Sequence, residues 1–230
     1  MYYHYVMKNP KAKMWFGFAM VSVLIGVTLF VSAGTTNYWQ AWVYLGVGAV
    51  SGVLLTLSII RDPILLENRT KGGPTAEQRL IQKIIVLCTG FPAIAAFIIP
   101  GLDRRFAWSN VPSWLSIVGD LLIIVSLWMV YRVFKENSFG STTVEITTGQ
   151  RVITTGPYAI VRNPMYSSAA VYFIGVSLAL GSYWGLVFVI PCFVIFALRI
   201  RDEEKLLQEE LSGYREYMQK VRYRLVPHVW

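Results

Sequence analysis

Long apolar runs separated by short polar segments dominate the chain up to about residue 198. Four runs are long enough to cross a bilayer, which takes roughly 20 apolar residues, and they occupy residues 14–33, 38–60, 80–99 and 113–134. A further apolar stretch, residues 167–198, is interrupted by small and polar residues at 181–185. Because each remaining piece has about 15 residues, this stretch predicts a short helical hairpin. The whole pattern predicts an all-α, polytopic membrane helix bundle with about six spans.

Beyond residue 198 the pattern changes, because charged residues now alternate with apolar ones at helical spacing. This spacing predicts an amphipathic helix over residues 202–220 that lies on the membrane surface or on neighbouring loops. We therefore divide a single membrane domain into two regions. Residues 1–134 form an N-terminal region of four spans, and residues 135–230 hold a long loop, the hairpin and the C-terminal helix.

The basic residues predict the orientation in the membrane. If the N-terminus is cytoplasmic, all of the 21 Lys and Arg residues except Arg104 and Arg105 lie on the cytoplasmic side, in agreement with the positive-inside rule. Lys8 and Arg79 are among the 19 basic residues expected on the cytoplasmic side. An even number of spans then places the C-terminus in the cytoplasm as well. We expect a multi-pass integral membrane protein with both termini cytoplasmic.

Composition narrows the possible functions. The chain is 55% hydrophobic and 15% charged, which leaves too little polar surface for a soluble domain of this size. Its net charge of +8 is spread over short clusters between apolar runs, so no nucleic-acid partner is expected. Cys88 and Cys192 lie inside apolar runs, and His4 and His228 lie near the two ends, so no metal site is expected.

The segment from Asn137 to Tyr166 is the most unusual part of the chain. It places glycines, prolines and Asn163 among alternating Val, Ile and Thr residues beside the membrane. Backbone of this kind is tolerated near a bilayer where protein covers it or where it lines a cavity. Its polar groups suit a cofactor site, but the same residues also suit a structured loop whose glycines and prolines only form turns.

A second candidate lies where the last apolar helix leaves the bilayer. Arg199 and Glu203 are four residues apart and share one helix face. Charges at the membrane edge of a bundle often face its interior or a water-filled site. The same pair could also be an ordinary surface ion pair whose side chains reach towards the interface.

Three segments resemble one known family. Residues 150–158, 161–166 and 199–204 read QRVITTGPY, VRNPMY and RIRDEE. Together they resemble the isoprenylcysteine carboxyl methyltransferases and their bacterial relatives, which are also similar to phospholipid N-methyltransferases. The resemblance is specific over about residues 137–227, while residues 61–69 and 102–106 also read like bacterial members. It implies a bacterial or archaeal inner-membrane protein.

This resemblance implies an enzyme that transfers a methyl group from S-adenosylmethionine. In that family the loop before the hairpin and the helix after it hold the cofactor in a pocket that faces the cytosol. Position by position, the implied cofactor-binding residues are Gln150, Arg151, Val152, Ile153, Tyr158, Asn163, Pro164, Met165, Tyr166 and Glu203. Arg199 matches the family arginine that faces the methyl acceptor, and we treat it as the catalytic residue. Asn163 departs from the pattern, since the family usually has His there.

The expected chemistry needs positioning more than acid or base catalysis, because the donor is a cation and its methyl group can be displaced directly. The acceptor would be a lipophilic small molecule or a lipidated molecule, such as an isoprenylcysteine-type carboxylate, and it would enter from the membrane lipid.

Two other functions stay open. Membrane sterol reductases resemble the same C-terminal segment but bind NADPH, and they typically carry Asn at the position of Met165. A transporter or membrane scaffold without enzymatic activity is the second possibility. Cofactor binding distinguishes the three, because the methyltransferase should bind S-adenosylmethionine, the reductase NADPH, and the transporter or scaffold neither.

Overall fold

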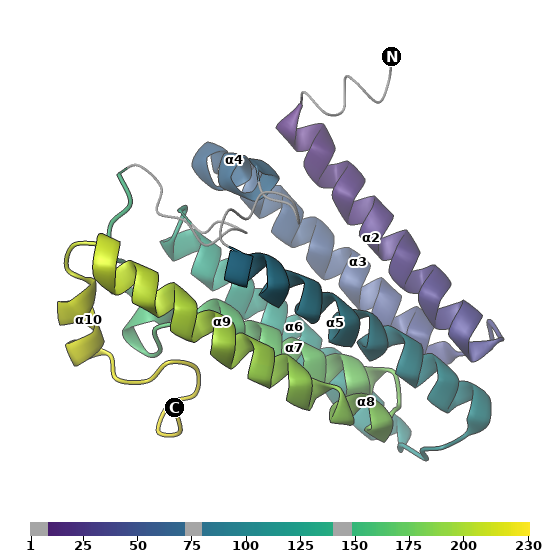
Figure 1. Ribbon diagram of the computed structural model, residues 1–230. Coiled ribbons are helices and arrows are strands. Elements are labelled where there is room, and N and C mark those ends of the chain that lie inside the picture. Colours follow the sequence, from purple (N-terminus) through teal and green to yellow (C-terminus); the bar gives the residue numbers. More distant parts are fainter. Residues whose placement is uncertain (1–8, 72–79, 140–148) are drawn as a thin grey trace.

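The computed structural model describes residues 9–71, 80–139 and 149–230, and Figure 1 shows how their helices pack side by side into a bundle. Within these ranges the chain forms helices and connecting segments, without a strand. The all-α prediction is therefore confirmed. The helices are α2 (Pro10–Ala33), α3 (Trp39–Ile60), α4 (Pro63–Lys71), α5 (Leu80–Phe106), α6 (Ser113–Glu136), η1 (Gly156–Ala159), α7 (Pro164–Ala179), α8 (Tyr183–Val187), α9 (Val189–Glu210) and α10 (Tyr214–Lys220).

Local sequence explains where the first long helix begins and ends. The Asn9 side chain accepts a hydrogen bond from the backbone N–H of Lys11 at 3.0 Å, and Pro10 occupies the first helical position. Both features stabilise a helix N-terminus. At the other end Gly34 adopts a left-handed conformation, with φ of 65°, which suits glycine and closes the helix.

Among the residues that the structure describes, five helical segments are long and apolar enough to cross a membrane. They are Pro10–Ala33, Trp39–Ile60, Gln82–Phe106, Ser113–Glu136 and Tyr183–Glu210, the last of which joins α8 and α9. Each of the four long runs predicted from the sequence coincides with one of these segments, apart from one or two residues at the start of the second and third runs. The apolar helix α7 has 16 residues, which is short for a full span. A multi-pass membrane helix bundle is confirmed, with five long helices and one shorter helix.

The second half of the hairpin differs from the sequence prediction. The turn lies where it was expected, because Gly181 has φ of 68° and Ser182 caps α8. However, α9 does not stop near residue 198, since it has 22 residues and runs from Val189 to Glu210. The predicted helix over 202–220 is therefore two elements, the end of α9 and the separate α10, because Gly213 takes a left-handed conformation between them with φ of 84°.

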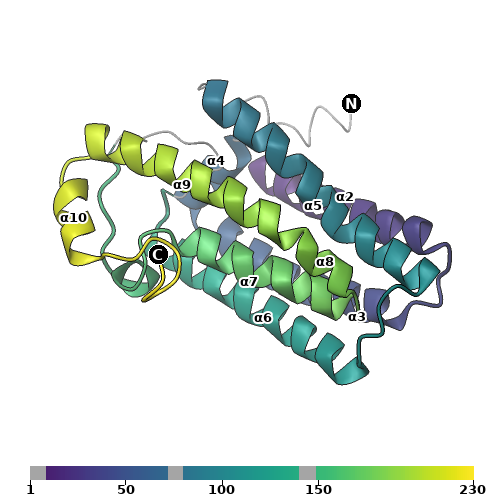
Figure 2. The same cartoon turned by 60° about the horizontal axis from the view of Figure 1, so that its bottom comes forward.

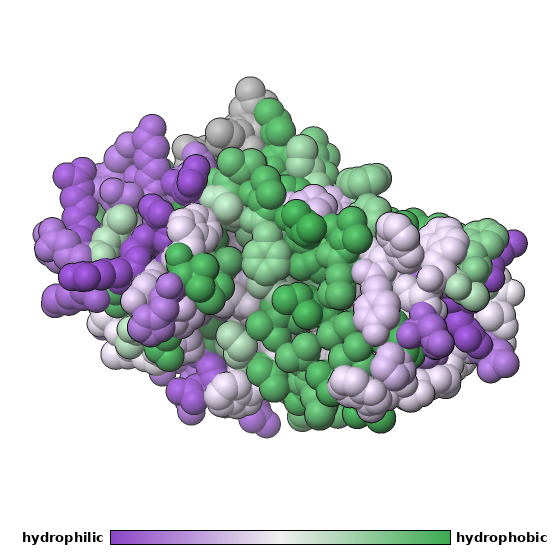
Figure 3. Space-filling model, turned by 90° about the horizontal axis from the view of Figure 1, so that it is seen from below, coloured by the Kyte–Doolittle hydropathy of each residue, from purple (hydrophilic) through white to green (hydrophobic). Residues whose placement is uncertain are grey.

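The outer surface is apolar over a broad band. Figure 3 shows this band on one face, with polar residues gathered towards the two ends of the molecule. Large side chains on the band are open to the surroundings, among them Val31, Leu87 and Phe91, which are 70%, 74% and 73% exposed. Soluble proteins rarely expose such a continuous apolar surface, so lipid is its natural solvent.

The close contact between α6 and α7 positions the loop that joins them. A Cβ atom on Gly119 of α6 would collide with the backbone of Ala179 in α7, and one on Gly175 would meet the backbone of Gly119. Small residues allow membrane helices to approach this closely. Because α6 and α7 are fixed together, the segment between them is held at the end where α6 finishes and α7 begins.

That end also gathers α4, the end of α9 and α10 (Figures 1 and 2). Arg104 and Arg105, at the end of α5, lie towards the opposite end. The placement of this end in the cytoplasm, and the division of the chain at residue 134, stay predictions. Residues 140–148 of the unusual loop lie outside the described residues, as do Lys8 and Arg79.

Candidate functional site

A cavity of about 340 Å³ lies at the end of the bundle where α4, α9 and α10 meet. Pockets for small molecules and cofactors typically enclose about 300–1,000 Å³. All residues that the sequence suggested for a site line this cavity: Gln150, Arg151, Val152, Ile153, Tyr158, Asn163, Pro164, Met165, Tyr166, Arg199 and Glu203. The structure thus brings together positions that lie up to 53 residues apart in the sequence.

Arg199, Glu203 and Tyr166 form the polar wall of the cavity. Arg199 and Glu203 are one turn apart on α9, and Tyr166 lies in the first turn of α7. The Tyr166 hydroxyl donates a hydrogen bond to Oε2 of Glu203 at 2.8 Å. The Tyr166 ring packs on Phe196, with 5.6 Å between ring centroids. These contacts fix the Glu203 carboxylate beside the Arg199 face of the helix.

Tyr158 is held by contacts at both its side chain and its backbone. The side chain of Asn137 donates to its hydroxyl at 2.9 Å, and the Tyr217 hydroxyl donates to its backbone carbonyl at 2.7 Å. Burial raises the pKa of the Tyr158 phenol, so the hydroxyl stays protonated at neutral pH. The GPY segment is therefore a turn of helix, η1, that presents an aromatic ring to the cavity.

Gly156 allows this turn to lie against the end of α6. Its φ is 57°, and a Cβ atom there would collide with the Glu136 side chain. The Thr155 hydroxyl donates to Oε2 of Glu136 at 2.7 Å, which ties the same turn to α6. From the sequence, the glycines and prolines of this segment could either form turns alone or also build a cofactor site. They do form turns, and these turns also build one wall of the cavity.

One wall of the cavity is apolar and aromatic. Tyr214 and Tyr217 of α10 pack with Val221, and Val152 and Leu211 lie against them. Leu206, Leu207, Leu211, Tyr214 and Tyr217 all line the cavity. None of these five residues was predicted from the sequence to be a site residue. Their helical spacing was visible, but it indicated a surface helix and not which partner that helix would cover.

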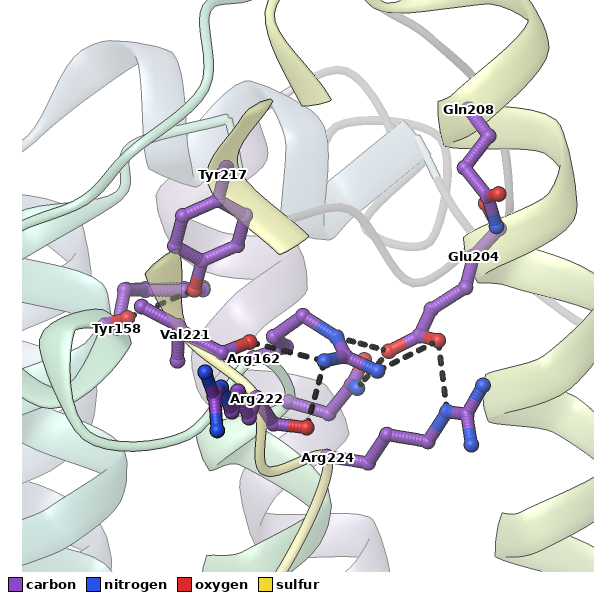
Figure 4. Close-up of polar contacts among 9 residues, drawn as sticks. Tyr158, Arg162, Glu204, Gln208, Tyr217, Val221, Arg222 and Arg224 are labelled. Atoms are coloured by element: carbon purple, nitrogen blue, oxygen red, sulfur yellow. Dashed lines mark hydrogen bonds and ion pairs between the residues drawn. The ribbon is translucent and has the colours of Figure 1, made fainter. Parts of the chain in front are cut away.

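Directly behind the polar wall lies a buried ion cluster, which we call the clamp: Arg162, Asn163, Glu204 and Arg224 (Figure 4). Glu204 is 1% exposed. Its two carboxylate oxygens accept from Nε of Arg162 and Nε of Arg224, each at 2.8 Å, and from the Asn163 amide at 2.9 Å. A buried carboxylate with this many donors is stabilised in its charged form.

The clamp joins the segment after α10 to the start of α7. Nη1 of Arg162 donates to the backbone carbonyls of Val221 and Arg222 at 2.9 and 2.8 Å. The backbone N–H groups of Arg162 and Asn163 donate to the carbonyls of Tyr223 and Arg224, each at 2.9 Å. The position before Pro164 therefore acts through both its side chain and its backbone, and the Asn163 amide fills a structural role beside the cavity.

The sequence did not indicate that Glu204 and Arg162 belong to a cluster, or that Arg69 lines the cavity. Arg69, on α4, lines the cavity together with Val133 and Asn137 of the α6 end. Its guanidinium carbon lies 4.3 Å from the centroid of the Phe134 ring. Arg162 lies inside a recognised motif, so a signal existed for it, but no sequence pattern placed Arg69 near residues 150–203.

Comparison with known proteins adds two findings. Residues 114–212 match the model of a family described as phospholipid methyltransferase. The delta(14)-sterol reductase of Mus musculus is 30% identical over 98 residues, which is 40% of this chain and 22% of the reductase. The chain thus corresponds to less than a quarter of that relative's length.

The family match covers α6, α7, α8 and α9, together with the loop between α6 and α7, and so includes most of the cavity lining. Arg69 lies before the matched region and Arg224 after it. The resemblance to membrane methyltransferases that the motifs predicted is confirmed. The family similarity of this chain thus lies in residues 114–212, which match the phospholipid methyltransferase model.

Proposed function

We propose that this chain is an S-adenosylmethionine-dependent methyltransferase that acts on a lipophilic or membrane-associated acceptor. The observation that carries the proposal is the cavity itself, because it gathers the loop, the start of α7 and the Arg199–Glu203 face of α9 into one polar-walled space within the family-matched region. We further propose that this end of the bundle faces the cytosol, where a water-soluble cofactor is available, as the distribution of basic residues predicts.

The residues that line the cavity suit the chemical groups of this cofactor. The carboxylate of Glu203 can accept from its ammonium group, and backbone groups of residues 150–153 can bond to its polar edges. The faces of Tyr158 and Tyr166 can pack against a sulfonium cation, since aromatic rings attract cations. The apolar wall formed by Leu207, Tyr214 and Tyr217 can cover the adenine ring.

The chain's own residues would act mainly by positioning. When bound, S-adenosylmethionine supplies an electrophilic methyl group, whose bond to sulfur breaks with both electrons staying on sulfur while a lone pair of the acceptor forms the new bond. Arg199 would hold an anionic acceptor in line with that bond, and Glu203 with Tyr166 would fix the donor side. A carboxylate acceptor needs no base for this transfer, whereas an amine acceptor would also have to release a proton.

A second candidate function is a reductase that uses NADPH. One observation favours it, namely the similarity of 98 residues of this chain to a delta(14)-sterol reductase. A reductase cavity would bind the nicotinamide cofactor, so the two functions differ in the ligand that the same cavity takes.

Calorimetric titration of the purified protein in detergent tests the proposal. S-adenosylhomocysteine should bind saturably, and NADPH should not compete with it. Glu203→Gln should weaken binding about 10- to 100-fold, because a charged hydrogen-bond acceptor is lost. Glu209→Gln, on the exposed surface of the same helix, is the matched control and should bind as the unmodified protein does.

Two outcomes would contradict the proposal. Binding of NADPH without binding of S-adenosylhomocysteine, in protein that unfolds cooperatively, would favour the reductase. Equal loss of affinity in Glu203→Gln and Glu209→Gln would show that the cavity is not where the ligand binds.

A further inference from the structure

Arg69 brings a further cationic side chain into the cavity, from the N-terminal half of the chain. It lies on α4, 45 residues before the first residue of the family match. It lines the cavity, and its guanidinium lies over the Phe134 ring at 4.3 Å. Its Nε atom is buried and has no hydrogen-bond acceptor among the residues that the structure describes.

Arg69 is half-buried, and its environment differs from that of Arg162, which is buried beside the cavity. Arg162 donates to both oxygens of Glu204 and to two backbone carbonyls. Within residues 9–71, 80–139 and 149–230, no carboxylate forms an ion pair with Arg69. Burial lowers the pKa of Arg69 to about 10, so the guanidinium remains charged at neutral pH.

A buried charge without a partner of opposite sign is costly, and proteins seldom keep one that a ligand does not meet. The Phe134 ring compensates only in part, since a cation–π contact contributes about 0.5–2 kcal/mol. A guanidinium directed at a cavity is well suited to carboxylate or phosphate oxygens, to which it can donate two parallel hydrogen bonds. Arg69 therefore has the surroundings of an anion-binding residue.

Arg69 lies beside a different part of the cavity from the wall that we propose for adenine. Two apolar clusters border the cavity, and Tyr158 packs against both. The first is formed by α10, Val152 and Leu207, the wall that we propose for adenine. The second contains Phe134, Val133 and Met165, together with side chains from α2 and α3. Arg69 belongs to the second side, which continues into the membrane-spanning helices from which a lipophilic molecule would enter.

We propose that Arg69 binds an anionic group of the methyl acceptor, a carboxylate or a phosphate, on the side of the cavity that faces α3 and α6. This inference rests on the proposed function. It adds α4, a helix outside the family-matched region, to the acceptor contacts that Arg199 would make within that region. The acceptor would then be an anionic amphiphile, and a neutral lipid of the same shape would be a poor ligand.

The test measures the binding of matched anionic and neutral amphiphiles to protein saturated with S-adenosylhomocysteine. One pair is an N-acetylated prenylcysteine carboxylate and its methyl ester, and the other is phosphatidic acid and diacylglycerol, all presented in detergent micelles. The unmodified protein should prefer the anionic member of at least one pair by about tenfold or more, and the preferred pair identifies the carboxylate or the phosphate as the source.

Arg69→Gln should remove this preference, with about 10- to 100-fold weaker binding of the anion, while the affinity for S-adenosylhomocysteine changes less than about threefold. Arg69→Lys keeps the charge and should retain part of the preference, which guards against loss through misfolding. Arg61→Gln removes a nearby exposed charge at the end of α3 and is the matched control, with no change expected.

Three results would overturn the inference while leaving the proposed function intact. The unmodified protein could bind both members of each pair equally. Arg69→Gln could leave the preference for the anion unchanged. It could also weaken S-adenosylhomocysteine about tenfold or more, which would assign Arg69 to the carboxylate of the cofactor. Failure of the unmodified protein to bind S-adenosylhomocysteine at all would instead overturn the proposed function.

Discussion

Glu203 and Glu204 are neighbours on α9, yet they belong to two different parts of the protein. Successive residues of a helix point about 100° apart. Glu203 consequently lies in the cavity wall with Tyr166, whereas Glu204 is buried in the clamp between Arg162 and Arg224. The two neighbouring glutamates therefore serve different purposes. Glu204 holds distant segments together in the clamp, and Glu203 presents charge to a ligand in the cavity wall.

The exposed fractions of the side chains in the clamp support this difference between the clamp and the cavity wall. The Arg162 and Glu204 side chains are 5% and 2% exposed, and the pair is bidentate. The cavity, in contrast, has polar groups of both signs around about 340 Å³ of space. Substitutions in the clamp should therefore change the free energy of unfolding first, and substitutions in the cavity wall should change ligand affinity first.

The largest effect is expected for Glu204→Gln. Removing the shared negative charge leaves two arginines in or near the interior without their partner, which should destabilise the protein by about 3–5 kcal/mol. The measurement is the free energy of unfolding in detergent, with unfolding induced by heat or denaturant. Glu203→Gln, the same chemical change at the neighbouring position, is the matched control and should alter the stability by less than about 1 kcal/mol. Equal destabilisation by both substitutions would contradict the claim that Glu204, and not Glu203, stabilises the fold.

Arg162→Lys should have an intermediate effect. Lysine keeps the charge but cannot donate at once to both Glu204 oxygens and to the carbonyls of Val221 and Arg222. We expect a loss of about 2 kcal/mol in the free energy of unfolding, together with faster proteolysis of the segment after α10. A variant that unfolds like the unmodified protein and resists protease equally would show that charge alone holds this segment.

Tyr166→Phe should have the smallest effect, and it should appear in binding. The substitution removes the hydroxyl that donates to Glu203 at 2.8 Å while keeping the ring on Phe196. The affinity for S-adenosylhomocysteine should fall about fivefold, which corresponds to about 1 kcal/mol. Tyr172→Phe, on the same helix, loses only a contact with the Tyr44 hydroxyl, and its affinity for this ligand should not change.

The long helices were predictable because membrane spans depend on a local property, the length of an apolar run. Residues 14–33, 39–60, 80–99 and 113–134 lie within helices of the structure, and Tyr38, the first residue of the second predicted run, directly precedes α3. The length of α9 was not predictable in the same way. The apolar run ends at Leu198, and the following residues are mostly charged. The helix nevertheless continues to Glu210, because its inner face lines the cavity and contributes Glu204 to the clamp.

The positions of the suggested site residues came from three motifs whose order matches a known family, so their gathering around one cavity followed from that resemblance. Their roles in binding stay predictions. The clamp could not be derived, because Glu204 is 42 residues from Arg162 and 20 from Arg224, and no local pattern links them. Arg69 is 130 residues before Arg199, and only the packing of α4 on the end of α6 brings it to the cavity.

The most direct test of the account is photolabelling of the cavity. The detergent-purified protein would be irradiated with S-adenosylmethionine that carries a labelled methyl group, and the labelled peptides would be mapped by mass spectrometry. The account predicts label on peptides that contain residues 149–166 or 199–217, and suppression of this label by an excess of S-adenosylhomocysteine but not by NADPH. Label confined to other helices, or label that S-adenosylhomocysteine does not suppress, would contradict the assignment of this cavity as the methyl-donor site.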